Sequence, residues 1–350
     1  MRYIETIHAQ GHVLCHDITV IVKDVKKGVA FKKGHVVTEE DIPELLKLGK
    51  DHLYVWEKDD TCYHEDEAAE ILRDVCMGQN MRPTMPQEGK IELIATCDGL
   101  LTIDSARLEA VNAIEEIMIA TRHGFTPVKA GDKLAGTRII PLVIEEEKMK
   151  TVKAQTMELT GGKPILELKP FHHKNVGIVT TGNEVFHGRI QDTFTPVIVD
   201  KLSEFDTEVI DHVTWDDDDK KVTASILDMI EKGADIVICT GGMSVDPDDK
   251  TPLAIKNTGA RIVSYGAPVL PGAMFLLAYY DRMAQGKNRR TVIMGLPGCV
   301  MYAKRTIFDL VLPRVMADDE VTADELAALG MGGLCLNCPT CTFPNCGFGK

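Results

Sequence analysis

The second half of this 350-residue sequence predicts a three-layer α/β/α domain on a mostly parallel sheet, preceded by small α+β modules. Beyond Pro170, strand and helix patterns alternate, as they do where helices connect parallel strands. The strands, such as "NVGIVTTG" and "ADIVICTGG", are apolar on both faces, which indicates helices on both sides of the sheet. Three strands end in the turns "TTGNE", "CTGG" and "GLPG". Because carboxyl ends of parallel strands share one edge, where ligands of such sheets bind, we expect a site there.

The first half predicts two modules that meet near residue 60. Residues 1–60 form a small, mostly β module around one helix, "DIPELLKLG", for which Thr38 is the expected N-cap. Residues 61–170 form an α+β module. It contains a helix within 61–79, strand patterns at 91–103 and 134–144, and an amphipathic helix over 106–124. Neither module contains a recognisable catalytic constellation.

The second half divides into the sheet domain, over residues 171–318, and a tail, over residues 319–350. The tail contains a short capped helix and a cysteine-rich end. In the sheet domain we predict strands at 175–182, 207–215, 234–242, 274–280 and 291–298, and helices at 192–205, 216–233, 251–259 and 300–316.

Composition narrows the class of protein. Hydrophobic residues make up 44% and charged residues 26% of the chain, and no apolar run reaches the ~20 residues of a membrane span. The first residues contain no apolar stretch typical of a secretory signal, which predicts a cytoplasmic protein. The net charge of −14 argues against a nucleic-acid or anionic-membrane surface. A small anionic ligand stays compatible if amides, lysines or a metal ion receive it.

The strand ends carry a family resemblance. The segments "VGIVTTGNEVFHGRIQDTF", "ADIVICTGGMSVDPDDKTP" and "VIMGLPG" resemble, in this order, the molybdopterin-binding domain shared by MoeA, MogA and MoaB, with CinA-type proteins as relatives. The resemblance covers residues 175–316. It implies that the ligand is molybdopterin, a pterin dithiolene with a terminal phosphate, or its nucleotide form. Each segment alone is a weak signal, whereas three in order are specific for the fold and the ligand class.

The resemblance also assigns roles to residues. Gly241, Gly242 and Ser244 would donate hydrogen bonds to the phosphate. Asp249 would hold a Mg²⁺ that bridges the carboxylate to the phosphate, whereas Asp246 and Asp248 in the same loop are expected to cap or solvate it. The other candidate catalytic acids are Glu184 and Asp192, and the other cofactor-binding candidates are Thr181, Gly182, Thr251, Pro271, Gly272, Pro297 and Gly298.

Departures from the family pattern leave several functions open. MoeA enzymes carry a lysine near "PGKP" and a second proline in "LPGNP", where this chain has "LPGAMF" and "LPGCV". The first half lacks the "DGYA" and "TGA" signatures of MoeA. The protein is therefore a molybdenumtransferase-like or adenylyltransferase-like enzyme, a non-catalytic carrier or sensor that docks on a molybdoenzyme, or a CinA-like nucleotide pyrophosphatase. A homodimer is compatible with the family.

Four cysteines crowd into the end of the chain, "CLNCPTCTFPNCGFGK". Cys335, Cys338, Cys341 and Cys346 are separated by two, two and four residues. In a cytoplasmic protein such cysteines are reduced, and four thiolates this close predict a metal centre. The spacing permits a tetrahedral Zn²⁺ and an iron–sulfur cluster equally, and a redox-sensitive tail without metal is the alternative.

Overall fold

The computed structural model describes the chain except residues 1, 23–25, 56–60, 245, 247–248 and 285. The chain forms two compact units, which are described separately. The first comprises Met1–Thr96, Ile103–Arg122 and Ala130–Glu167, and the second comprises Cys97–Thr102, His123–Lys129 and Leu168–Lys350. Among the described residues, no helix has the length and apolar character needed to cross a bilayer.

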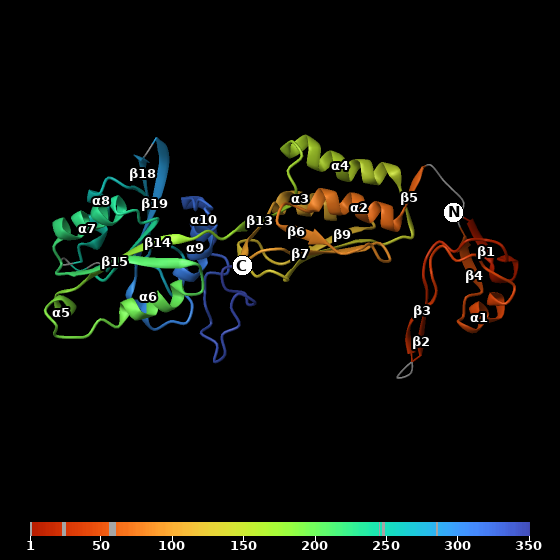
Figure 1. The fold of residues 1–350 in the computed structure, drawn as a ribbon, viewed down its shortest axis with the longest axis horizontal. Helices are drawn as coiled ribbons and strands as arrows, with labels where there is room; N and C mark the ends of the chain where they lie inside the picture. The colour runs from red at the N-terminus through yellow and green to blue at the C-terminus, as the bar shows by residue number, and fades with distance from the viewer. Residues whose placement is uncertain (1, 23–25, 56–60, 245, 247–248, 285) are drawn as a thin grey trace. The chain divides into compact units, whose positions relative to one another are not determined.

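The first unit contains antiparallel sheets and short helices (Figure 1). Strands β1 and β4 pair, as do β2 with β3 and β5 with β12, while a four-stranded sheet has the order β6-β7-β11-β9. Helix α2 packs against this sheet and against α4. The elements are β1 (Arg2–Glu5), η1 (Thr6–His8), β2 (Ile18–Val22), β3 (Lys26–Phe31), α1 (Asp41–Lys47), β4 (His52–Val55), β5 (Cys62–His64), α2 (Glu65–Cys76), β6 (Met81–Pro83), β7 (Lys90–Ala95), α3 (Ser105–Asn112), β9 (Ile117–Thr121), β11 (Lys133–Ile139), β12 (Val143–Glu145) and α4 (Glu146–Thr160).

The second unit is built on a six-stranded sheet of order β15-β14-β16-β19-β18-β17. Strands β15, β14, β16 and β19 are parallel, and β18 runs antiparallel to both of its neighbours. A three-stranded sheet, β10-β8-β13, is separate from it. The elements are β8 (Gly99–Ile103), β10 (Thr126–Val128), β13 (Leu166–Pro170), β14 (Lys174–Thr181), α5 (Asn183–Phe186), α6 (Phe194–Leu202), β15 (Thr207–Trp215), α7 (Asp219–Glu231), β16 (Ile236–Thr240), α8 (Thr251–Asn257), β17 (Arg261–Tyr265), β18 (Leu276–Ala284), β19 (Lys287–Leu296), η2 (Gly298–Met301), α9 (Ile307–Met316) and α10 (Ala323–Ala328).

Two hydrophobic cores lie on opposite faces of the six-stranded sheet. Ile236 and Ile238 of β16 pack with α6 and α9, whereas Val237 and Cys239 of the same strand pack with α7 and α8. Successive strand residues point to opposite faces, so a strand buried on both faces is apolar throughout. This arrangement confirms the predicted three-layer α/β/α fold with its mostly parallel sheet.

The amphipathic helix predicted over 106–124 is wrong in its second half. Helix α3 ends at Asn112, and β9 begins at Ile117. The Asn112 side chain ends the helix by donating to the carbonyl of Ile119 (2.9 Å) and accepting from its N–H (2.7 Å). The segment that follows, with β-branched residues at Ile117, Ile119 and Thr121, then pairs with β11, a tertiary contact that overrides the helical periodicity.

Two predicted helix starts are also corrected. The helix expected over 300–316 begins at Ile307, because Thr306 forms a capping box with Asp309. Residues 298–301 form a separate 3₁₀ turn, η2. Thr38 is not the N-cap of α1, which begins at Asp41. Its N–H and hydroxyl instead both donate to the Asp41 carboxylate at 2.8 Å.

Candidate functional site

The ends of three parallel strands meet at one edge of the six-stranded sheet. Thr180 of β14 pairs with Thr240 of β16, and Thr240 pairs with Leu296 of β19. The turns that follow these strands therefore lie along one edge, as predicted. We call residues 181–182, 241–244, 249–251 and 297–298 the rim.

Glycine is required at the rim by the packing of two strand ends. Gly241 and Gly242 both have left-handed backbones, with φ of 79° and 53°. A Cβ at Gly241 would overlap the carbonyl oxygen of Thr181, and a Cβ at Gly242 would lie 2.9 Å from the Thr251 hydroxyl. The tight turn thus brings the β16 loop directly against the end of β14.

Threonine hydroxyls hold the rim together. The Thr251 hydroxyl donates to the carbonyl of Gly241 (2.9 Å) and lies 3.1 Å from the Thr181 hydroxyl. Thr181 can also donate to the carbonyl of Thr240 (3.2 Å). The Thr240 hydroxyl is buried and finds no hydrogen-bond partner among the described residues. These contacts fasten the β16 loop to the start of α8 and place the predicted residues Thr181 and Thr251 in one buried network.

The predicted acids have different surroundings. Asp249 is half-buried, its carboxylate accepts from the N–H of Asp246 (3.3 Å), and its own N–H donates to the Asp246 carbonyl (2.9 Å). Asp246 and Ser244 are exposed, and Asp248 lies outside the described residues. The hydroxyl of Tyr265 donates to the Met243 carbonyl (3.0 Å) and supports the loop from β17. The pKa of Tyr265 is raised by burial and by the negative charge of Asp249.

Asp192 caps a helix in this structure. Its carboxylate accepts from the N–H groups of Phe194 (2.9 Å) and Thr195 (3.0 Å) and from the Thr195 hydroxyl (2.6 Å). Burial opposes ionisation, but these hydrogen bonds outweigh it and lower the pKa of Asp192. Glu184 is exposed in the first turn of α5. Within the described chain, the carboxylates of Glu184, Asp192 and Asp249 do not gather at one ion-sized point.

The loop before β18 reaches the same edge of the sheet, because Leu276 of β18 pairs with Gly295 of β19. In this loop the carbonyl of Pro271 accepts from the N–H of Ile307 (3.2 Å), and Gly272 packs so closely on Ile307 that a Cβ would overlap its side chain. The loop is therefore fixed to the start of α9. Pro297 and Gly298 form the turn from β19 into η2.

All four tail cysteines line one cavity of about 530 Å³. Pro271 and residues 302–305 form part of its wall. Cys338 and Cys341 are exposed, and Cys335 and Cys346 are half-buried against the core of the second unit. The structure thus brings the four predicted ligands to a single place. Within the described chain, no three of these sulfurs lie within 4.8 Å of one another.

Hydrogen bonds connect the cysteine segment to the loop before β18 and to the segment that follows η2. The N–H of Cys335 donates to the carbonyl of Leu270 (2.8 Å), and the N–H of Leu270 donates to Gly333 (2.8 Å). The ammonium of Lys304 donates to the carbonyls of Cys338 (3.2 Å) and Pro339 (2.8 Å). Sequence reasoning missed Lys304, although it lies in a basic pair, "KR", that begins four residues after the "LPGCV" turn.

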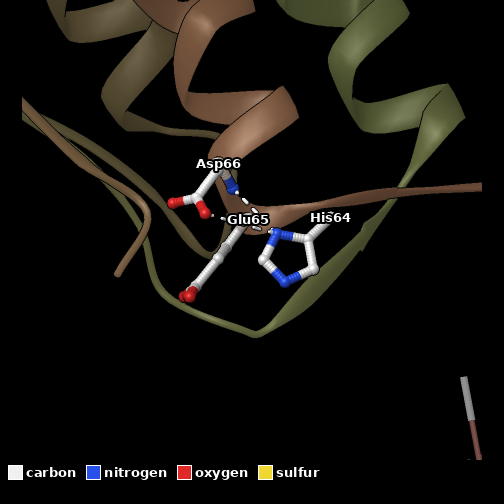
Figure 2. Close-up of side chains that lie close together, drawn as sticks. All are labelled: His64, Glu65 and Asp66. Atoms are coloured by element: carbon white, nitrogen blue, oxygen red, sulfur yellow. Dashed lines mark hydrogen bonds and ion pairs between the residues drawn. The ribbon is translucent and has the colours of Figure 1, made fainter. Parts of the chain in front are cut away.

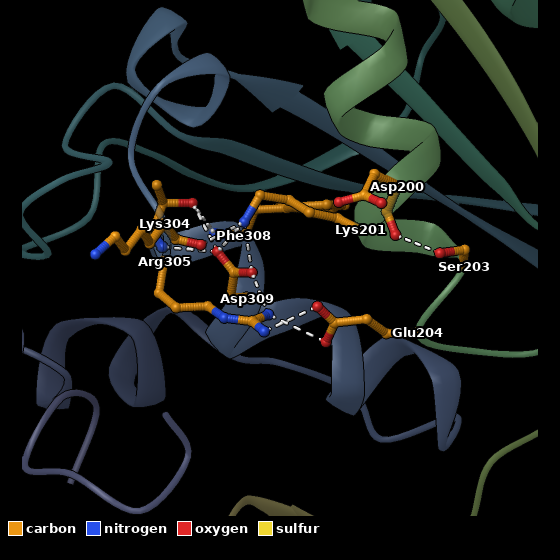
Figure 3. A network of polar contacts seen from close by, with 9 residues as sticks. Asp200, Lys201, Ser203, Glu204, Lys304, Arg305, Phe308 and Asp309 are labelled. Carbon is orange, nitrogen blue, oxygen red and sulfur yellow. Dashed lines mark hydrogen bonds and ion pairs between the residues drawn. The ribbon is translucent and has the colours of Figure 1, made fainter. Parts of the chain in front are cut away.

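An ionic network centred on a buried pair lies at the start of α9 (Figure 3). Lys201 of α6 is 7% exposed and Asp309 of α9 is 6% exposed, and their side chains pair at 2.7 Å. Arg305 contacts the same carboxylate at 2.9 Å and reaches Glu204 at 2.8 Å, and its guanidinium lies 5.1 Å from the ring centre of Phe343 in the tail. The network therefore links α6, α9 and the cysteine-rich segment, a connection that no local sequence pattern reveals.

A second cluster, in the first unit, consists of His64, Glu65 and Asp66 at the start of α2 (Figure 2). Lys33 places its ammonium 3.0 Å from Nδ1 of His64 and 2.7 Å from the Asp66 carboxylate, and Nε2 of His64 donates to the carbonyl of Cys15 (2.7 Å). Lysine thus supplies the positive charge of this cluster. Burial, with the adjacent negative charge of Asp66, raises the pKa of Glu65 to about 7.

Comparisons with known proteins agree with the geometry of the second unit. Residues 177–317 match the family described as a probable molybdopterin binding domain, and residues 3–57 match a domain of unknown function. A CinA-like protein of Mycobacterium tuberculosis is 37% identical over 75 residues, which span 21% of this chain and 17% of that protein. A molybdopterin molybdenumtransferase of Haemophilus influenzae is 27% identical over 167 residues, which span 46% of this chain and 39% of that protein.

Solved structures also resemble part of the chain. The tungsten cofactor synthesizing protein MoaB from Pyrococcus furiosus is 22% identical and covers 41% of this chain and 92% of its own, with a TM-score of 0.33. A CinA protein from Thermoplasma acidophilum is 17% identical and covers 41% of this chain and 99% of its own, with a TM-score of 0.32. On the family match and the sequence relatives, residues 177–317 are similar to the molybdopterin-binding domain of molybdenum cofactor biosynthesis proteins and CinA-like proteins.

Proposed function

We propose that the rim binds molybdopterin or its nucleotide, and that the protein takes part in making or delivering the molybdenum cofactor. One observation supports this proposal most directly. The residues that match the family are those whose strand ends meet at the rim, with Gly241 and Gly242 in the central turn.

The β16 loop fits an anionic group. In the described chain, no oxygen accepts a hydrogen bond from the N–H groups of Gly242, Met243 and Ser244. Successive N–H groups in a glycine turn form a concave site for anions. The buried, unpartnered hydroxyl of Thr240 directly precedes this turn. The loop therefore offers donors that a terminal phosphate would satisfy.

The half-buried Asp249 fits a Mg²⁺ ion at the same loop. Mg²⁺ is usually held by one or two carboxylates together with phosphate oxygens and water, so a single well-placed aspartate is sufficient. When bound, Mg²⁺ would neutralise charge between the carboxylate and the phosphate. Asp249 is positioned for this by its two hydrogen bonds to Asp246, and Tyr265 holds the preceding loop residues in place.

The rim favours binding and positioning over covalent catalysis. Asp192 accepts hydrogen bonds from the N–H groups of Phe194 and Thr195 and from the Thr195 hydroxyl at the start of α6, and Glu184 is exposed. Charge neutralisation and orientation would then carry any phosphate or metal transfer. The departures at Ala273 and Cys299 make a carrier or sensor role the main alternative. A cytoplasmic location, a homodimer and docking on a molybdoenzyme stay predictions.

A CinA-like nucleotide pyrophosphatase is a further candidate. The stretch with 37% identity to CinA-like proteins favours it, together with the loop "DPDDKT". Mg²⁺-dependent hydrolysis of a nucleotide in the absence of any pterin would separate this activity from molybdopterin binding.

Equilibrium binding of molybdopterin to the full chain, with and without Mg²⁺, tests the proposal. We expect tight binding that requires Mg²⁺ and weakens at least tenfold in Asp249→Ala. The matched control is Asp246→Ala, which removes an exposed carboxylate from the same loop and should leave binding unchanged. Absence of binding under every condition would show that the family likeness is one of fold alone.

A further inference from the structure

The cysteine-lined cavity has a size and spacing that discriminate between metal centres. A tetrahedral zinc with Zn–S bonds of ~2.3 Å holds its four sulfurs roughly 3.8 Å apart. Among the described residues, no three of the sulfurs of Cys335, Cys338, Cys341 and Cys346 approach within 4.8 Å of one another. They line a cavity of about 530 Å³ instead, which is far larger than one metal ion. The site is therefore wider than a zinc tetrahedron.

A cubane cluster needs its four sulfurs farther apart than a single zinc does. In a [4Fe–4S] cluster each thiolate binds a different iron atom, so the four sulfurs surround the cluster and do not converge on one ion. The segment also contains two consecutive two-residue gaps between cysteines, a spacing used by bacterial iron–sulfur sites. Spacing and cavity thus favour the same class of centre.

The segment that lines the cavity is packed against the fold and is not a loose end of the chain. Phe348, two residues after the last cysteine, is 4% exposed and belongs to the core of the second unit. A Cβ at Gly332 would overlap the carbonyl of Lys350, and a Cβ at Gly349 would lie 2.5 Å from the side chain of Leu310. These contacts hold both ends of the cysteine segment against the fold.

The cavity also carries positive charge. Four thiolates around a [4Fe–4S]²⁺ core leave a net charge of −2, which a nearby cation stabilises. Lys304 lies in the wall and donates only to carbonyl oxygens, and no carboxylate of the described chain pairs with it. Arg305 lies beside it, although its charge is shared with Glu204 and Asp309.

We propose that Cys335, Cys338, Cys341 and Cys346 ligate a [4Fe–4S] cluster in this cavity, with Lys304 compensating its charge. Each thiol loses one proton when it binds iron, and the iron and sulfide enter as the assembled cluster. The proposal stands independently of pterin binding at the rim. Because Pro271 and residues 302–305 belong to the wall, the cluster would lie next to the loops that leave the rim.

Metal and sulfide analysis of the full chain tests this proposal. The protein would be purified without oxygen and reconstituted with sulfide and equal amounts of ferrous and ferric iron, which supply the two Fe²⁺ and two Fe³⁺ of a [4Fe–4S]²⁺ core, in competition with zinc. We expect about four iron atoms and four sulfides per chain, with the visible absorption of an iron–sulfur centre. A single bound zinc, or no bound metal at all, would overturn the proposal.

Two ligand variants and one control make the test specific. Cys341→Ala and Cys338→Ala remove exposed thiols, so the fold should persist, as circular dichroism can verify. Each should lose most of the iron. Cys299→Ala, which removes a thiol outside the cavity wall, should keep it. Equal iron content in all four proteins would refute ligation. Molybdopterin binding, measured separately, shows whether the rim still works when the cluster is lost.

Discussion

Gly241 packs so closely on Thr181 that a single added methyl group would overlap the Thr181 carbonyl oxygen. The two residues follow adjacent parallel strands, β16 and β14, whose register brings their ends together. The glycine turn of the rim is therefore determined first by the packing of two strand ends, and this packing exposes the amides that follow it.

We predict that Gly241→Ala destabilises the second unit by about 2 kcal/mol or more, because it combines a left-handed backbone with a steric clash. Chemical denaturation measures the loss. Gly188→Ala is the matched control, since Gly188 also has a positive φ, 66°, but has open space around it. Equal losses in the two variants would show that backbone strain alone, and not the contact with Thr181, makes glycine necessary.

The buried pair Lys201–Asp309 should respond asymmetrically to mutation. Asp309→Ala leaves the Lys201 ammonium buried with only the Lys304 carbonyl as a partner, and we expect a loss of about 3–5 kcal/mol. Lys201→Met should cost less, because Arg305 still pairs with the carboxylate. Denaturation curves of both variants provide the comparison. If Lys201→Met is the more damaging change, Arg305 does not hold Asp309 as its 2.9 Å contact indicates.

Glu65 should make the first unit less stable as pH rises. Its pKa in the folded protein, about 7, lies above its ordinary value of 4.5, because burial and the charge of Asp66 disfavour the carboxylate. The folded state therefore binds the proton more tightly, and this contribution is present below pH 4.5 and lost as pH rises to about 7. The total effect is up to about 3 kcal/mol.

Denaturation midpoints at pH 5 and pH 8 measure this effect. Glu65→Gln cannot ionise, so it should be more stable than the parent at pH 8 and nearly equal to it at pH 5. The pKa of His64 is lowered by burial and by Lys33, and this also makes stability depend on pH. Because His64 is present in both the parent and Glu65→Gln, its contribution cancels when the two proteins are compared. Glu70→Gln, an exposed site on the same helix, is the control. If the denaturation midpoint of Glu65→Gln changes between pH 5 and pH 8 as much as that of the parent, Glu65 is not the source of the pH dependence.

Loss of the proposed cluster should weaken pterin binding at the rim. Residues 298–305 run from the rim turn to the cavity wall, and Lys304 fastens this segment to the cysteine loop. Lys304→Gln should lower both iron content and molybdopterin affinity severalfold. Lys220→Gln, an exposed site at the start of α7, should change neither. Full affinity in a protein stripped of iron would show that protein contacts alone fasten the segment.

Several elements could be predicted because their signals are local. The capped helix expected in the tail begins after Thr322, where the structure shows a capping box, and α7 begins after Asp218. The helix predicted over 106–124 failed because a strand-forming run lay in a helical period, and only pairing with β11 decides between the two. Asp192 likewise looks like a catalytic acid in the sequence. In the structure its carboxylate accepts hydrogen bonds from the N–H groups of Phe194 and Thr195 and so caps a helix.

The sequence by itself determined the three-layer class, the three glycine-bearing strand ends at one edge and the group of four cysteines. These follow from apolar periodicity and residue spacing, which act within one strand, helix or turn. Tertiary structure alone decided that Gly241 packs on Thr181, that Lys201 meets Asp309, and that the cysteines surround a cavity wider than one ion. Those relationships join residues far apart in the chain, and their distances are set by close packing of the layers between them.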